Sequence, residues 1–379
     1  MTYEFLQNYW WLLVSLLGAI LVALMFVQGG NFWAVVLNLD ETKKRMIINS
    51  TGRKWELTFT TLVVFGGAFF ASFPLFYSTS FGGAYWVWII ILFTFVFQAV
   101  SYEFQNKKGN LLGAKTFRIF LAINGCLAPL LVGTAVGTFF SGANFTVNKN
   151  AIVGGASPVI SAWANNWHGL DALGSPWAVL LGVSVFLLAL TLGGLYTINN
   201  VDDQSLVATM RKWVLRSGVA FVIAFVAWVA HLLMCCGFDV SANGTVSLVH
   251  YKYLNNFLEM PAVLAVFLVG VVLVLMGVFK GAFTKSLQGI WFAGLGTICA
   301  VLALLLVAGY NGTAYYPSLA DLQSSLTIRN SSSSPFTLKA MFFASLAVPF
   351  VIAYIAYAWH ALDKKPITQK EMEQEGFKY

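Results

Sequence analysis

Residues Lys43 to Pro74 read KKRMIINSTGRKWELTFTTLVVFGGAFFASFP. The stretch begins with a basic cluster, passes through Trp55 and Glu56, and continues as a long apolar segment. Basic residues collect in the cytoplasmic loops of membrane proteins, so this cluster predicts the orientation of the chain. A carboxylate at the start of an apolar helix is costly unless it is paired or used, which makes Glu56 a candidate functional residue.

The composition of the whole chain is that of a membrane protein. Of its 379 residues, 59% are hydrophobic and 10% are charged, whereas about 25% of an ordinary soluble domain is charged. The first apolar run, from Trp10 to Leu37, has no basic n-region and no small-residue cleavage site. We therefore expect a retained span rather than a signal peptide. The net charge of +7 does not indicate nucleic acid binding, because the basic residues lie in short loops between spans.

The apolar runs predict an all-α integral membrane fold with nine transmembrane helices, since each run has the length that crosses a hydrocarbon core. We expect these helices at about residues 10–37, 57–79, 84–105, 117–140, 177–200, 214–236, 261–280, 288–310 and 338–361. Residues 1–379 then form a single polytopic membrane domain. The long loops 141–176, 237–260 and 311–337 are too short for cores of their own, and we expect packed caps there.

The distribution of Lys and Arg tests this count, because the positive-inside bias alternates between successive loops. The 22 basic residues divide 18 to 4 between the two sides without an exception. The rich side holds Lys43, Lys44, Arg45, Arg53, Lys54, Lys107, Lys108, Lys115, Arg118, Arg211, Lys212, Arg216, Lys280, Lys285, Lys364, Lys365, Lys370 and Lys378. The poor side holds Lys149, Lys252, Arg329 and Lys339. This pattern predicts an N-terminus outside and a C-terminus in the cytoplasm.

Cysteine and histidine usage argues against metal and haem chemistry on this chain. The four cysteines form no CxxC motif and no Cys/His cluster, and we interpret them as small buried apolar residues; they are Cys126, Cys235, Cys236 and Cys299. His231 is the one histidine that we place inside a span, and we expect it to be a hydrogen-bonded core residue. One such histidine is too few for a multi-haem site, and we expect no catalytic or metal-binding residue here.

Polar residues inside the spans are the informative ones, because each costs free energy in the bilayer unless it faces protein or water. Gln28 and Asn31 flank two glycines within the first span. Two interpretations stay open: the amides bond across helices at a packing kink, or they line a pocket for a ligand or water. Gly-Gly pairs at residues 66–67 and 193–194 predict close helix packing.

Two acids are expected at one cytoplasmic entrance. Glu56 opens the second span, while Glu103 closes the third, and antiparallel neighbours place these ends on the same side. Two nearby carboxylates suit a proton-uptake mouth, because one of a close pair can hold a proton. The alternatives are that Glu56 interacts with the helix dipole, and that Glu103 is a solvated acid paired with Lys107 or Arg118.

Several runs resemble subunit II of the cytochrome bd-type quinol oxidases. At the start the similar runs are Tyr3-Glu4, Trp10–Val14, Arg45–Ser50, Trp55 followed by an acid, Gly66–Ala71 and Pro74. Near the end they are Tyr316-Pro317, Ser325–Thr327, Asn330–Ser333, Thr337-Leu338, Val348-Pro349 and Tyr357–Trp359. The resemblance covers both ends of the chain well and the middle weakly.

The resemblance implies a fold of two four-helix bundles plus a peripheral helix. The first bundle would cover about residues 1–140, the second about 177–310, and the peripheral helix about 338–361. It also implies a bacterial inner-membrane complex in which a haem-bearing subunit I carries haems b and d and oxidises quinol. This chain would bind no haem, stabilise its partner, contribute to a cytoplasmic proton path and bind structural lipid or quinone. A small single-helix subunit is a further candidate partner.

The chain departs from the family pattern at its acids. The family usually has two acids in the first helix, where this chain has Gln28 and Asn31. The acid and arginine that close the third helix of the family correspond here to Glu103 and Gln105. The resemblance therefore leaves Glu56 and Glu103 as proton-path residues, with Trp55 beside them. The alternative is a secondary transporter with a polar site at the midplane, which would need paired broken helices or inverted repeats.

Overall fold

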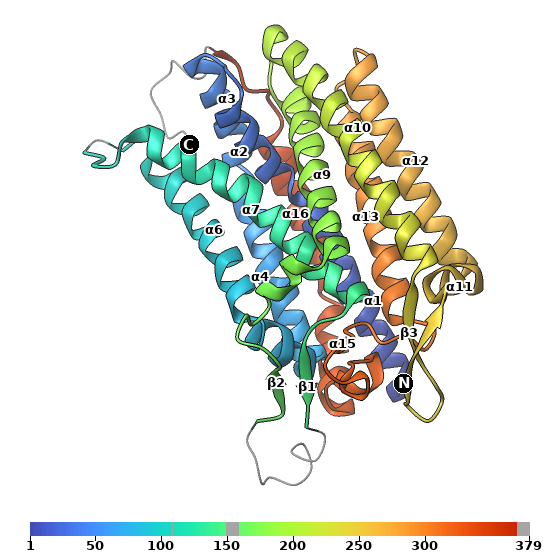
Figure 1. Cartoon of the computed structure of the whole chain (residues 1–379). Coiled ribbons are helices and arrows are strands. Elements are labelled where there is room, and N and C mark those ends of the chain that lie inside the picture. Colours follow the sequence, from blue (N-terminus) through green and yellow to red (C-terminus); the bar gives the residue numbers. More distant parts are fainter. Residues whose placement is uncertain (108, 149–158, 370–379) are drawn as a thin grey trace.

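The computed structural model describes residues 1–107, 109–148 and 159–369, and it is a tightly packed set of long helices (Figure 1). Within these residues eight helices are long and apolar enough to cross a membrane. A ninth span results if two consecutive helices that meet at 41° count as one bent span. The nine-helix membrane fold is thus confirmed with that pair included. Of the basic residues sorted above, Lys108, Lys149, Lys370 and Lys378 lie outside the described residues.

The first half of the chain supplies four of the spans. The first span consists of α1 (Tyr3–Leu24) and α2 (Phe26–Val36), and the second of α3 (Glu41–Gly52) and α4 (Trp55–Ser72). The short α5 (Pro74–Tyr77) and a π-helical turn (Ser78–Gly82) lead to α6 (Tyr85–Phe104) and α7 (Gly113–Ser141). β1 (Phe145–Val147) and β2 (Ser161–Trp163) then form a small antiparallel sheet.

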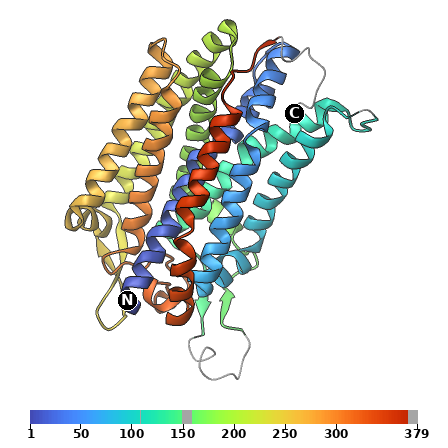
Figure 2. The same ribbon diagram turned by 180° about the vertical axis from the view of Figure 1, so that it is seen from behind.

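The second half begins with a 3-10 turn (Leu170–Gly174) and continues with α9 (Pro176–Asn200) and α10 (Gln204–Met234). The hairpin of β3 (Cys236–Val240) and β4 (Val246–His250) and the short α11 (Lys252–Glu259) follow, and then α12 (Pro261–Phe283) and α13 (Gly289–Gly309). The last elements are a 3-10 turn (Leu322–Ser324), α14 (Ile328–Ser331), α15 (Pro335–Ser345) and α16 (Val348–Leu362). Figure 2 shows α16 running along the outside of the helices.

Two glycine positions set how closely α2 and α9 approach. A Cβ built on Gly29 would lie 1.8 Å from the Ala189 carbonyl oxygen, and one on Gly193 would lie 2.3 Å from the Gly30 nitrogen. Any side chain here would force the two backbones apart. The prediction of close packing therefore holds for the pair at 193–194. It does not hold for the pair at 66–67, because a Cβ on Gly66 would meet Phe81 at an ordinary 3.5 Å and one on Gly67 would meet nothing within 4 Å.

The basic stretch that begins at Lys43 is helical rather than a loop. Asp40 caps α3 by accepting a hydrogen bond from the Lys43 backbone N–H at 2.9 Å, which satisfies a donor left free at a helix start. The side chain of Lys43 also binds this carboxylate and holds the pKa of Asp40 below its ordinary value. Met46, Ile47 and Ile48 are buried, so the helix packs against the other spans instead of lying free in solvent.

Candidate functional site

Three amide side chains meet between α2, α6 and α7, and we name them the amide cluster. They are Gln28, Gln98 and Asn124, each with none of its surface exposed. The Gln28 Nε2 donates to Gln98 Oε1 and to Asn124 Oδ1, each at 3.3 Å. Gln28 Oε1, Gln98 Nε2 and Asn124 Nδ2 have no hydrogen-bond partner among the described residues. Because buried polar atoms are nearly always satisfied, the cluster suits bound water.

A second polar group begins one helical turn further along α2. The Tyr102 hydroxyl donates to Asn31 Oδ1 at 2.5 Å and lies 2.9 Å from Thr51 Oγ1, which itself lies 2.9 Å from Asn31 Oδ1. All three side chains are buried, and we name them the hydroxyl cluster. Residues three apart on a helix share a face, so Gln28 and Asn31 connect the two clusters along α2.

An aromatic contact connects the hydroxyl cluster, at the end of α6, to the start of α4. The ring of Trp55, the first residue of α4, stacks on Tyr102 with 6.0 Å between ring centroids and 22° between planes. Glu56 and Glu103 are the next residues along each helix, and both are exposed. The structure therefore places these two carboxylates at the same end of α4 and α6. Gln105, just beyond, is buried, and its Nε2 has no partner among the described residues.

Neither carboxylate makes an ion pair or side-chain hydrogen bond with any described residue. The sequence left open a pairing of Glu103 with Arg118, but Arg118 binds Glu41, with 2.6 Å between Nη1 and Oε2. Lys107, the other candidate partner, places its Nζ 6.0 Å from the ring of Phe104. Both acids are thus available to solvent.

A buried ion pair lies at this same end. Lys54 has a fully buried side chain, and its Nζ lies 2.9 Å from Oδ1 of Asp363, the residue that follows α16. The same oxygen accepts from Asn200 Nδ2 at 3.1 Å and from the Tyr196 hydroxyl at 3.4 Å. The ring of Trp359 lies 5.1 Å from the Lys54 ammonium. Sequence reasoning missed this pair, although Asp363 is an acid placed directly after the last apolar run.

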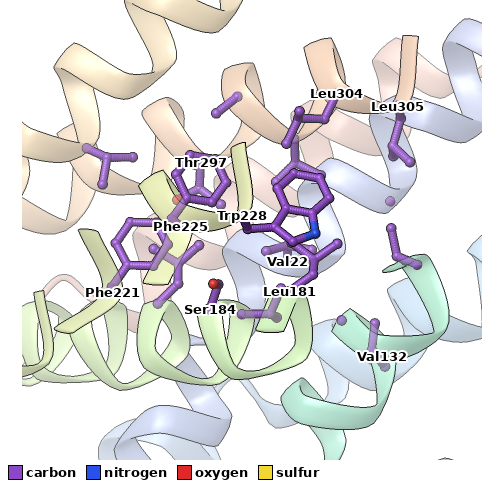
Figure 3. A pocket seen from close by; sticks show the side chains of 18 of the residues that line it. Val22, Val132, Leu181, Ser184, Phe221, Phe225, Trp228, Thr297, Leu304 and Leu305 are labelled. Atoms are coloured by element: carbon purple, nitrogen blue, oxygen red, sulfur yellow. The ribbon is translucent and has the colours of Figure 1, made fainter. Parts of the chain in front are cut away.

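An apolar cavity lies between the helices, and no residue of either polar cluster lines it (Figure 3). Its volume is about 150 Å³. Side chains from α1, α4, α7, α9, α10, α12 and α13 line it, among them Val22, Val132, Leu181, Phe225, Trp228 and Leu304. The only hydroxyls in its lining, Ser184 and Thr297, donate to carbonyls of their own helices. The cavity therefore suits a hydrocarbon and offers no site for a charged solute.

The histidines are dispersed. His231 stacks on Trp177, with 3.6 Å between ring centroids, and His168 bonds the Gly83 carbonyl at 3.1 Å. Among the described residues no group of three or more His, Cys, Asp or Glu side chains could hold a metal ion. His360, just before the chain leaves α16, is exposed.

Two predictions about the cysteines, their burial and the absence of a nearby histidine, are wrong. All four are half-buried rather than fully buried. Cys236 also has a histidine neighbour, because its Sγ lies 3.2 Å from Nδ1 of His250. The two residues are fourteen positions apart, and only the pairing of β3 with β4 brings them together. No spacing motif in the sequence could have shown this contact.

Comparison with known proteins gives consistent matches over nearly the whole chain. The family model described as "Cytochrome bd terminal oxidase subunit II" matches residues 6–362. The cytochrome bd-I ubiquinol oxidase subunit 2 of Escherichia coli K12 is 26% identical over 393 residues, covering 98% of each chain. The cytochrome bd ubiquinol oxidase subunit 2 of Bacillus subtilis is 26% identical over 377 residues, covering 97% of this chain and 98% of the relative.

A solved structure shows the same fold. The bd oxidase of Geobacillus thermodenitrificans matches with a TM-score of 0.61 and 11% sequence identity. The match covers 96% of this chain and 98% of the solved chain.

Proposed function

We propose that this chain, which belongs to the cytochrome bd terminal oxidase subunit II family, is the haem-free subunit of a complex that oxidises quinol and reduces oxygen to water. In this proposal a haem-bearing subunit I holds haems b and d and the reacting quinol, while this chain supplies a scaffold and part of the cytoplasmic proton route. Membership of the family and the shared fold support the assignment. The match of the family model to residues 6–362 favours this assignment over a secondary transporter.

The proton route proposed here starts at Glu56 and Glu103. Both carboxylates are exposed at one end of the helices, so they can exchange protons with water. Trp55 and Tyr102, the residues that precede the two acids, stack on each other, and the Tyr102 hydroxyl is buried directly below. A hydroxyl both donates and accepts a hydrogen bond, so it can pass a proton along a chain of waters. The single observation that carries this proposal is that two groups of buried polar side chains, the hydroxyl cluster and the amide cluster, lie beneath the two acids.

The interior of the proposed route is neutral. Asn31, Gln28, Gln98 and Asn124 are amides, and an amide does not ionise in the physiological range. These groups can hold water in place, but they cannot store a proton as a carboxylate does. In this chain storage would therefore fall to Glu56 and Glu103 at the mouth. Charge-free side chains in the interior also avoid the insertion penalty of a buried acid.

The apolar cavity supports a second part of the proposal. Its lining is almost wholly hydrocarbon and aromatic, which suits a lipid chain or the isoprenoid tail of a quinone. Such a molecule would fill space between α10, α12 and the first span. Its role would be structural, because no polar group in the lining points to a reacting head group.

Purification of the complex through a tag on this chain tests the proposal. We expect a haem-bearing partner to co-purify, with an absorption spectrum of b and d haems and quinol:oxygen oxidoreductase activity. A small single-helix subunit would be seen in the same preparation by mass spectrometry. An isolated haem-free chain that binds a polar solute would overturn the assignment in favour of a transporter.

A further inference from the structure

The hairpin of β3 and β4 brings a thiol and an imidazole together far from the polar clusters. Cys236 and His250 are direct partners in the register of the two strands. The Cys236 Sγ lies 3.2 Å from Nδ1 and 3.7 Å from Nε2 of His250. A nucleophile and a base within hydrogen-bond reach are the minimum arrangement for an activated thiol.

The backbone around this pair is fixed on both sides. The Cys235 N–H donates to the His231 carbonyl at 2.8 Å where α10 ends, and the Tyr251 N–H donates to the Cys235 carbonyl at 3.1 Å. The Ala314 N–H donates to the Phe238 carbonyl at 3.0 Å, which ties the hairpin to the loop after α13. Tyr251 has a φ of 58°, so the chain turns sharply directly after the histidine. The separation of sulfur and imidazole is therefore set by the fold.

The Cys236–His250 pair is accessible, and the neighbouring Cys235 provides a thiol for comparison. His250 is exposed and Cys236 is half-buried, so a small reagent can reach the sulfur. Cys235, the preceding residue, is also half-buried, but its thiol donates to the Leu232 carbonyl at 3.3 Å. Two adjacent thiols thus differ in their partner: an imidazole for one and a backbone carbonyl for the other.

We propose that Cys236 is a thiol modification site at which His250 acts as general base, and that its substrates are small-molecule disulfides. As the sulfur attacks, the S–H bond breaks and its proton passes to His250 Nδ1. A new S–S bond forms to one sulfur of the disulfide, while the old S–S bond breaks. The leaving thiolate takes the proton back from the imidazolium. The distribution of basic residues predicts that the hairpin lies outside the cytoplasm, where disulfides persist.

The test measures thiol–disulfide exchange in the purified complex with 4,4′-dithiodipyridine near neutral pH. Release of thiopyridone gives the rate, and mass spectrometry locates the modified cysteine. Cys235→Ser retains Cys236 with its base, whereas Cys236→Ser retains Cys235 as the matched control. Because an unassisted thiol is only a few per cent thiolate at pH 7, we expect Cys236 to react about tenfold faster than Cys235.

Removal of the base is the deciding comparison. In Cys235→Ser combined with His250→Gln, we expect the rate at Cys236 to fall to that of Cys235, and added free imidazole to restore part of it. His250→Asn serves the same comparison if the Gln variant does not assemble, as judged by size-exclusion chromatography. Equal rates at the two cysteines, or an unchanged rate without His250, would overturn the proposal. Because quinol oxidation plays no part in this assay, its outcome is independent of the proposed function.

Discussion

The ammonium of Lys54 lies 2.9 Å from the carboxylate of Asp363, a residue 309 positions later in the chain. This contact joins the start of α4 to the end of α16. No residue of α16 itself is buried, so few apolar contacts hold that helix to the rest of the structure. The ion pair and the Ile367–Asn200 backbone hydrogen bond of 2.9 Å together fix its C-terminal end.

Breaking this pair from one side should be costly. Lys54→Met leaves the carboxylate of Asp363 in a buried place without its cation, and Asp363→Leu does the reverse. Each single change is expected to lower the free energy of unfolding by about 3–5 kcal/mol. The double variant should be milder than the sum, because it leaves no unpaired charge. A double-mutant cycle on thermal unfolding of the complex measures the coupling between the two residues. Strictly additive losses would show that the ion pair contributes no interaction energy.

Glu56→Gln should lower turnover without loss of haem. The substitution keeps the size of the side chain and removes its ability to hold a proton. We expect oxygen reduction to slow by about tenfold, corresponding to about 1.4 kcal/mol in the barrier. Oxygen consumption and the haem spectrum, measured on one preparation, separate proton supply from assembly. Glu4→Gln, at an exposed acid on the opposite end of the helices, is the control, and equal turnover in all three proteins would exclude a role for Glu56.

Tyr102→Phe tests the step below the mouth. It removes the hydroxyl that donates to Asn31 Oδ1 but leaves the ring that stacks on Trp55. The hydroxyl also contacts Thr51 Oγ1, and each hydrogen bond lost costs about 1 kcal/mol of stability, so the complex should still assemble. Turnover should fall in Tyr102→Phe and stay near normal in Tyr196→Phe, a matched buried tyrosine outside the route. If both variants slow equally, the effect of Tyr102 is structural.

Filling the apolar cavity should displace its occupant. Val222 lines the cavity, whereas Val219, three residues earlier on α10, is 50% exposed. We expect Val222→Phe to reduce the lipid or quinone retained per complex, and Val219→Phe to leave it unchanged. Organic extraction followed by mass spectrometry of the purified complex measures both. Equal retention in the two variants would show that the cavity holds neither molecule.

The spans were predictable because each must present a long apolar surface to lipid. Hydropathy and charge alternation depend on local composition, so they located the first span and the last one to within several residues. The division into two four-helix bundles, and the outside location of the N-terminus, stay predictions. Glu56 and Glu103 could be placed at one end because antiparallel neighbours leave no other arrangement.

The contacts inside the bundle were not predictable in the same way. In the sequence Lys54 is one of the basic residues that indicate topology, yet its side chain turns inward to an acid from the far end of the chain. The helix α3 was also missed, because its mixture of basic and apolar residues has no long hydrophobic run. Gln98 and Asn124 are single amides in apolar segments, and nothing in the sequence indicates that they meet. Such contacts depend on which helix faces become neighbours, and no local pattern records that.

The depth of the amide cluster has an electrical consequence. The helix α6 covers 20 residues, about 30 Å at 1.5 Å per residue, which matches a hydrocarbon core of about 30 Å. Gln98 lies only about 9 Å along the axis from the last residue of α6. A proton that reached the amide cluster from Glu56 would therefore have crossed about a third of the hydrocarbon core. Moving one charge across 100 mV takes about 2.3 kcal/mol, so about two thirds of that work would remain beyond the amide cluster.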